Sequence, residues 1–135
     1  MALQKHSIFK NIDSLQLYVP NLQEGIEYYC NSFGLNIIWK SDSAIGLGME
    51  DETTEIVIQN QRNTQEIDIK VTSVIDAIKD IEKAGGQIIY GPFDIEIGKC
   101  AIVKDPWNNQ YAILDTTKGT FITDKLGNII GQNAP

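Results

Sequence analysis

Histidine is almost absent from this sequence, cysteine is scarce, and no long apolar run occurs. The only histidine is His6, and the two cysteines are Cys30 and Cys100. Two cysteines without a CxxC spacing are too few for a disulfide framework, so we expect two plain thiols that behave as small apolar residues when buried. No apolar segment approaches the roughly 18 residues that a membrane-spanning helix needs. The sequence thus indicates neither a disulfide scaffold nor a membrane span.

Basic residues are also in deficit. The chain has 11 Lys and Arg against 18 Asp and Glu, a net charge of −7. Nucleic acids and anionic membrane surfaces bind basic patches, so neither is an expected partner. An acidic surface is compatible with a cationic ligand, and it also simply keeps a protein soluble. Residues 1–8 contain neither an apolar core nor a small-residue cleavage site, which leads us to expect a cytoplasmic location.

A weak internal repeat organises the chain. Glu66 lies 52 residues after Ser14, and apolar and polar residues alternate in the same way after each of them, over 14–19 and 66–71. Such alternation is typical of a half-buried strand. At the same offset Asn21 and Ser73 are good helix N-caps, which predicts helices over 22–33 and 74–84. Each predicted helix is followed at that offset by a glycine suited to a left-handed C-cap, Gly34 and Gly86.

Three strand-like runs follow each predicted helix. They span 35–40, 44–49 and 55–59 in the first half, and 87–90 (continuing toward 97), 100–104 and 110–115 in the second. Turn-forming residues separate them. Length and composition suit one compact domain over 1–135. We therefore predict an α+β fold of two tandem βαβββ modules, one over about 12–61 and one over about 65–117.

The two ends of the chain carry no chemical motif. Residues 118–135 resemble a small hairpin, with strand-like segments at 121–123 and 129–130 around a turn-like 124–128. Residues 1–10 are predicted to be an irregular lead-in.

Two βαβββ modules resemble the vicinal oxygen chelate superfamily, which includes glyoxalase I, bleomycin-resistance proteins and extradiol dioxygenases. The local matches are Val19–Leu22, Phe33–Leu35, Lys83–Gly86 and Asp105–Asn109. The last is similar to the family's Asp-Pro-x-Gly-Asn turn, with Asn108 in place of glycine, and asparagine adopts left-handed conformations more readily than most residues. The resemblance implies curved mixed sheets around a central cup that takes a small ligand, and a homodimer.

The resemblance also implies where metal ligands would stand in metal-dependent members. Those proteins place histidines and glutamates near the start of each module's first strand and on each module's last strand. Here Ser14 and Glu66 stand at the first-strand positions and Ala112 at the last-strand position of the second module. The equivalent position in the first module is Glu55, Ile56 or Val57. Serine and alanine do not replace a histidine pair, so we predict no metal site and no cofactor.

Strand alternation predicts which side chains face the cup. If Leu15, Leu17 and Val19 pack under the first helix, the residues between them face the other way. The predicted ligand-binding residues are Ser14, Gln16, Tyr18, Trp39, Glu55, Glu66, Asp68, Lys70 and Ala112, with Trp107 as a further aromatic candidate. Without the resemblance, Glu66, Asp68 and Lys70 would be interpreted as a solvated strand face with screened ion pairs.

Three functions compete at this stage. The first is a metal-independent small-molecule binding protein that sequesters its ligand in the cup, as in the bleomycin-resistance branch. The second is a glyoxalase- or dioxygenase-like enzyme that uses Glu66 or Glu55 as a base or as a weak cation ligand. The third is an interaction domain whose cup is filled by its own side chains.

Overall fold

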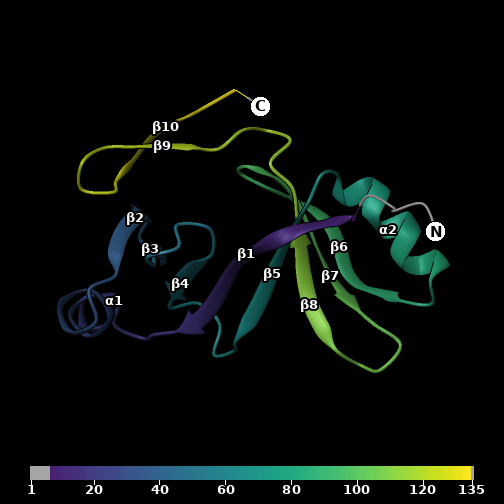
Figure 1. The fold of residues 1–135 in the computed structure, drawn as a ribbon, viewed down its shortest axis with the longest axis horizontal. Helices are drawn as coiled ribbons and strands as arrows, with labels where there is room; N and C mark the ends of the chain where they lie inside the picture. Colours follow the sequence, from purple (N-terminus) through teal and green to yellow (C-terminus); the bar gives the residue numbers. More distant parts are fainter. Residues whose placement is uncertain (1–6, 135) are drawn as a thin grey trace.

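The computed structural model describes residues 7–134, and they form two βαβββ modules followed by a hairpin (Figure 1). The first module contains β1 (Phe9–Tyr18), α1 (Leu22–Ile26), the π-helix η1 (Glu27–Ser32), β2 (Asn36–Lys40), β3 (Ala44–Gly48) and β4 (Glu55–Gln59). The second contains β5 (Glu66–Val71), α2 (Val74–Lys83), β6 (Gln87–Ile95), β7 (Gly98–Lys104) and β8 (Gln110–Leu114). The hairpin strands are β9 (Phe121–Thr123) and β10 (Ile129–Gln132).

The eight module strands form one curved mixed sheet in the order β2-β3-β4-β1-β5-β8-β7-β6. The first strands of the two modules, β1 and β5, pair antiparallel at its centre. Within each module the first strand pairs parallel with the last, β1 with β4 and β5 with β8. The predicted α+β architecture is therefore confirmed, and the join between β1 and β5 brings the repeated polar residues of the two modules side by side.

Each helix covers the outer face of its own module (Figure 1). The α2 helix buries Val74, Ala77 and Ile81 against the second half of the sheet, where Val103 and Ile113 are completely buried. The first helix packs its apolar residues on Ile45, Leu47 and Ile58. Both N-caps form as predicted, because the side chains of Asn21 and Ser73 accept hydrogen bonds from the backbone N–H groups of Glu24 and Asp76 at 3.1 and 3.2 Å.

The two helices end differently, which corrects one prediction. Gly34 has a φ of +81° as expected, but in the second module the left-handed residue is Gly85, with a φ of +98°, and not Gly86. The predicted first helix divides into a short α-helix and the π-helix η1. A π-helical turn holds one more residue than an α-helical turn. The offset between equivalent residues of the two modules therefore falls from 52 to 51 across this segment, and Gly34 corresponds to Gly85.

The first strand is longer than predicted. Phe9 and Lys10 belong to β1, so the expected irregular lead-in is wrong for these two residues, while His6 lies outside the described residues. The ring of Phe9 packs edge-on against Tyr111 at 5.8 Å between centroids, which attaches the start of the strand to β8. The pairing of β1 with β5 shifts register between Ile12 and Ser14, a β-bulge at Asp13.

The C-terminal hairpin forms where it was predicted and crosses back toward the first module (Figure 1). Lys40 donates its backbone N–H to Gly127 O at 2.8 Å, and Phe121 packs 6.0 Å from Trp39. The hairpin thus covers the inner face of the sheet instead of extending into solvent. Within residues 7–134, no helix has the length and apolarity to cross a membrane.

Candidate functional site

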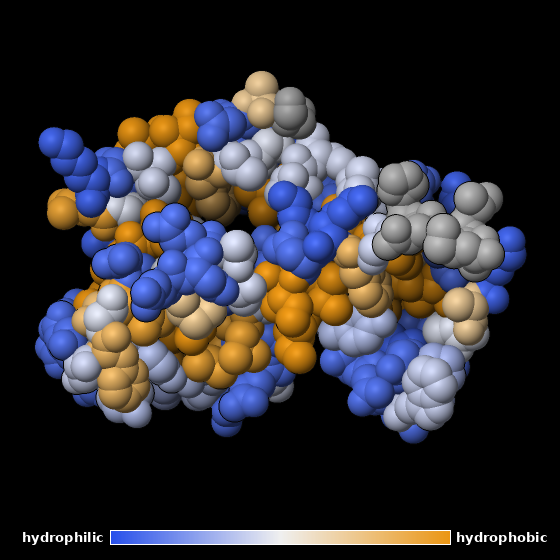
Figure 2. Space-filling model, in the orientation of Figure 1, coloured by the Kyte–Doolittle hydropathy of each residue, from blue (hydrophilic) through white to orange (hydrophobic). Residues whose placement is uncertain are grey.

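The inner face of the sheet and the hairpin enclose a cavity of about 960 Å³. Figure 2 shows the opening beneath the hairpin as a dark hollow. Its floor is polar and comes from β1, β4 and β5, the strands that meet at the module junction. Its opposite wall is apolar and comes from β6, β7, β8 and the hairpin. The cavity volume is that of a site for a small organic molecule.

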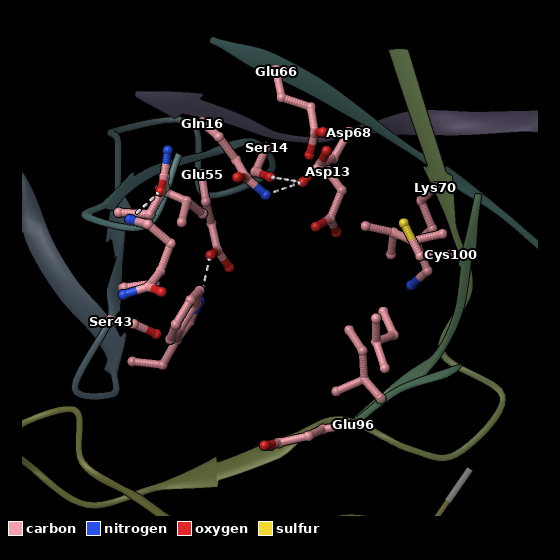
Figure 3. Close-up of a pocket in the computed structure, with 18 of the residues that line it drawn as sticks. Asp13, Ser14, Gln16, Ser43, Glu55, Glu66, Asp68, Lys70, Glu96 and Cys100 are labelled. Carbon is pink, nitrogen blue, oxygen red and sulfur yellow. Dashed lines mark hydrogen bonds between the residues drawn. The ribbon is translucent and has the colours of Figure 1, made fainter. Parts of the chain in front are cut away.

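Asp68 is the most buried acid on the floor, with only 5% of its surface exposed. Ser14 Oγ and Gln16 Nε2 both donate to its Oδ2, at 3.0 and 2.8 Å (Figure 3). The other oxygen, Oδ1, is buried and receives no hydrogen bond from a donor in the described structure. The neighbouring Glu66 carboxylate is itself an acceptor, so the two acids interact favourably only with a proton between them.

This environment raises the pKa of Asp68 to about 8. Burial is the largest cause, followed by the hydrogen bond and the charge of Glu66, while the donors Gln16 and Ser14 act in the opposite direction. The raised pKa favours the protonated, neutral form of Asp68 at pH 7. In that form the carboxyl group has a proton to donate to Glu66, which the ionised form lacks.

Glu55 lies on β4, the neighbouring strand of the floor. The indole Nε1 of Trp39 donates to its Oε1 at 2.7 Å (Figure 3). Burial raises the pKa of Glu55, and the charge of Asp13 adds to this, although the indole hydrogen bond lowers it. Gly46 makes the contact possible, since a Cβ at this residue would overlap the indole nitrogen and lie 2.6 Å from Glu55 Oε1.

Asp13 is a cavity residue that the strand alternation did not predict. Alternation sends Asp13 and Ser14 to opposite faces, but the β-bulge turns both into the cavity. Burial and the charge of Asp68 raise the pKa of Asp13, and the charge of Lys70 lowers it. Burial thus raises the pKa of three carboxyl groups in the cavity, those of Asp13, Glu55 and Asp68.

Two cations border the acids. The Arg62 side chain is 55% exposed, donates to Gln16 Oε1 at 2.6 Å, and lies 3.9 Å from Glu66 Oε2. Lys70 also lines the cavity, and its charge acts on Asp13. Arg62 therefore lies at the exposed edge of the floor.

The apolar wall is a second hydrophobic cluster on the inner side of the sheet. Cys100, Ala112 and Leu114 are its buried members, with Phe93, Ile95, Ile97 and Ile102 packed against them. Burial raises the pKa of Cys100 to about 12, and the nearby Asp68 and Glu66 charges contribute. Cys100 is thus an unreactive wall residue at neutral pH, as expected of a buried thiol.

The structure brings together seven of the nine predicted site residues around this cavity. They are Ser14, Gln16, Trp39, Glu55, Glu66, Asp68 and Lys70. Tyr18 and Ala112 do not line it: Tyr18 is half-buried at the end of β1, and Ala112 is completely buried beneath the wall. Trp107 is 78% exposed in the turn before β8, away from the cavity.

Sequence reasoning missed the contribution of the tail. Thr120, Phe121 and Thr123 line the cavity, although no chemical motif marks the segment. The hairpin pattern predicted the strands but not the surface on which they pack. Gln59, the last residue of β4, and Arg62, in the loop that follows it, were also missed.

The strand register identifies the positions where a metal-dependent relative would hold its ligands. Gln16 pairs with Val57 as Asp68 pairs with Ala112, so Val57 is the first-module equivalent of Ala112. Neither side chain has a donor atom. Within the described part of the chain, no three His, Cys, Asp or Glu residues lie close enough to hold a metal ion. The donor set therefore does not fit the family's metal centre.

A family model described as Glyoxalase/Bleomycin resistance protein/Dioxygenase superfamily matches residues 11–113. Methylmalonyl-CoA epimerase from Mycobacterium tuberculosis is 11% identical, with a TM-score of 0.67 over 84% of this chain and 92% of that one. A variant of homoprotocatechuate 2,3-dioxygenase from B. fuscum is 17% identical, with a TM-score of 0.53 over 80% of this chain and 33% of that one. At these identities the structural likeness shows the fold alone. None of the curated proteins compared with this chain matches it.

Proposed function

Because this chain belongs to the glyoxalase/bleomycin resistance protein/dioxygenase superfamily, we propose that it is a metal-independent small-molecule binding protein that holds its ligand in the cup between the modules. The observation that carries the proposal is the cavity of about 960 Å³, with polar groups on one side and an apolar wall on the other. Polar groups at fixed positions orient a ligand, and the apolar wall supplies most of its buried surface. An open cavity of this size argues against a cup filled by its own side chains.

Ligand screening with and without a chelator tests this function. Purified protein is first analysed for bound metals, and its thermal unfolding is then measured against a panel of small molecules with and without EDTA. We expect ligand-dependent increases in melting temperature that EDTA leaves unchanged, since binding to the folded state alone raises stability. A stoichiometric transition metal, or stabilisation that EDTA abolishes, would overturn the metal-independent proposal.

A second candidate is an enzyme of the same superfamily that moves a proton with a floor carboxyl group. The raised pKa values of Glu55 and Asp68 favour it, because an acid–base catalyst works best with a pKa near the operating pH. The solved structures of similar fold include some named as epimerases and one named as a dioxygenase. Glu55 or Glu66 would be the base, with Asp68 holding a proton beside Glu66. Solvent deuterium incorporation into a bound ligand, lost in Glu55→Gln or Glu66→Gln, would identify this chemistry.

We also propose a homodimer, which the family resemblance implies. Light scattering coupled to size-exclusion chromatography measures the mass directly. A species of twice the 15.1 kDa chain mass is expected, and a monomer at micromolar concentration would contradict it.

A further inference from the structure

We infer that the ligand is an organic monocation, with an ammonium group among the floor acids Asp13, Glu55 and Glu66 and an apolar body against the inner wall. This inference rests on the proposed binding function and specifies the chemical class of the ligand.

The charge of the cavity lining is unbalanced. Of residues 7–134, five contribute carboxyl groups to it, Asp13, Glu55, Glu66, Asp68 and Glu96, against the two cations of Arg62 and Lys70. Four of the five come from the three strands of the floor, and Figure 3 shows them directed toward the same space. Glu96 faces that space from the opposite side, below the hollow (Figure 3).

The two cations compensate for these acids only in part. The charge of Lys70 acts on Asp13, but within residues 7–134 Lys70 forms no ion pair with a cavity acid. Arg62 is largely exposed and is hydrogen-bonded to Gln16, and among the described residues it forms an ion pair with Glu66 alone. In the described part of the chain, no ion pair involves Glu55, Asp13 or Asp68. Among the described side chains, one donates to Glu55, and it is the neutral indole of Trp39. Burying carboxylates without a counter-charge is unfavourable, and a bound cation relieves this cost.

The buried Asp68 shows that the floor takes up positive charge, since a proton on Asp68 is what makes its contact with Glu66 favourable. It is 95% shielded from solvent, lines the cavity, and has one oxygen without a donor while the adjacent Glu66 is also an acceptor. Only a proton or a cation makes that pair favourable. A cation bound beside Glu66 favours the ionised forms of Glu66 and Asp68, so the proton that they share dissociates more readily. Ligand binding should therefore release protons to solvent.

The spacing of the acids favours an organic cation over a metal ion. No three of the acids in residues 7–134 converge on one point, as metal coordination would need. An ammonium group is satisfied by one or two carboxylates at hydrogen-bond distance, with its remaining N–H donor directed to water or to a neutral acceptor. The wall opposite offers Phe93, Ile102 and Leu114 to an apolar body, and Phe121 closes it from the hairpin. The combination suits an amine with a hydrocarbon or aromatic skeleton.

Three probes that share one ring system test the charge requirement. They are 1-naphthylmethylamine, the neutral 1-naphthalenemethanol and the anionic 1-naphthoate, each titrated into the protein at pH 7 by isothermal calorimetry. We expect the amine to bind about tenfold or more tightly than the alcohol, since a hydrogen bond to a charged group contributes on that order. The anion should not bind. Amine titrations in two buffers of different ionisation enthalpy should also show net proton release.

Substitutions of single acids test which carboxylates bind the ammonium group. Glu55→Gln keeps an acceptor for the Trp39 indole, and Glu66→Gln removes the second floor charge, so each should weaken amine binding about tenfold and weaken alcohol binding much less. Glu82→Gln on the exposed surface of α2 is the matched control and should bind like the parent protein. Thermal unfolding of each variant confirms that it is folded.

The outcomes separate this inference from the proposed function. If the amine and the alcohol bind equally tightly, or if neither Glu55→Gln nor Glu66→Gln weakens amine binding, the ligand is not a cation. The cup would then still be a binding site. Binding of 1-naphthoate in preference to the amine also overturns it. Failure of all three probes at millimolar concentration, together with no stabilising ligand in the thermal screen, overturns both.

Discussion

Replacing Asp68 by asparagine tests whether the deepest acid of the cup is neutral at physiological pH. Asparagine has the shape of the protonated acid: its amide oxygen accepts from Ser14 and Gln16, and its amide nitrogen donates to Glu66. At pH 6 the variant should therefore be about as stable as the parent protein. A variant that no longer folds at pH 6 would contradict a neutral Asp68.

The pH dependence of stability gives the magnitude. The pKa of Asp68 rises from 3.8 to about 8 on folding, so between these values the folded protein holds a proton that the unfolded chain has lost. The stabilisation from this proton is complete below the unfolded pKa and is lost as the pH rises through the folded pKa. The free energy of unfolding then falls by about 1.4 kcal/mol per pH unit, or about 2 kcal/mol between pH 6 and 8 once partial deprotonation near pH 8 is included.

The assay is urea unfolding at constant ionic strength from pH 5.5 to 8.5, followed by tryptophan fluorescence. Asp13 and Glu55 also have raised pKa values, and burial, the largest cause of each, remains in both proteins. The difference between the parent and Asp68→Asn therefore reports chiefly on Asp68, together with its charge effect on Asp13. Asp80→Asn, on the exposed face of α2, is the matched control and should keep the parent slope. Equal slopes for the parent and Asp68→Asn would refute a raised pKa at this site.

Three further substitutions test the packing around the cup. Gly46→Ala should destabilise the protein by about 1–3 kcal/mol in urea unfolding, because the added methyl group would overlap the Trp39–Glu55 hydrogen bond; an unchanged midpoint would mean that the indole moves freely. Asp115→Ala should cost about 1–3 kcal/mol or more at pH 7, since it leaves the N–H groups of Val74 and Lys99 without their buried acceptor; full stability would show that water replaces it. Phe121→Ala should speed proteolysis of the hairpin relative to Ile130→Ala, an exposed control, and equal cleavage rates would show that the contact with Trp39 does not hold the hairpin.

Local sequence patterns determined most of the architecture. Strand alternation, N-cap residues and turn residues depend on neighbours in the chain, so they indicated the order of elements in both modules and the C-terminal hairpin. Asn108 is an example: it has a φ of +71°, which its place in the Asp-Pro turn predicted. Residue identity alone also showed that the hydroxyl of Ser14 does not replace a histidine ligand and that Ala112 has no ligating atom.

Tertiary structure determined which residues line the cup and how they interact. A one-residue bulge at Asp13 changes which side chains of β1 face the cup. A π-helical turn before Gly34 changes the offset between the two modules. No residue type in the sequence predicts either feature. Register alone showed that Val57, and not Glu55, is equivalent to Ala112. The packing of Phe121 on Trp39 likewise depends on contact between distant segments. The pKa of Asp68 arises from burial among groups on different strands, and burial is a property of the folded chain that its local sequence does not encode.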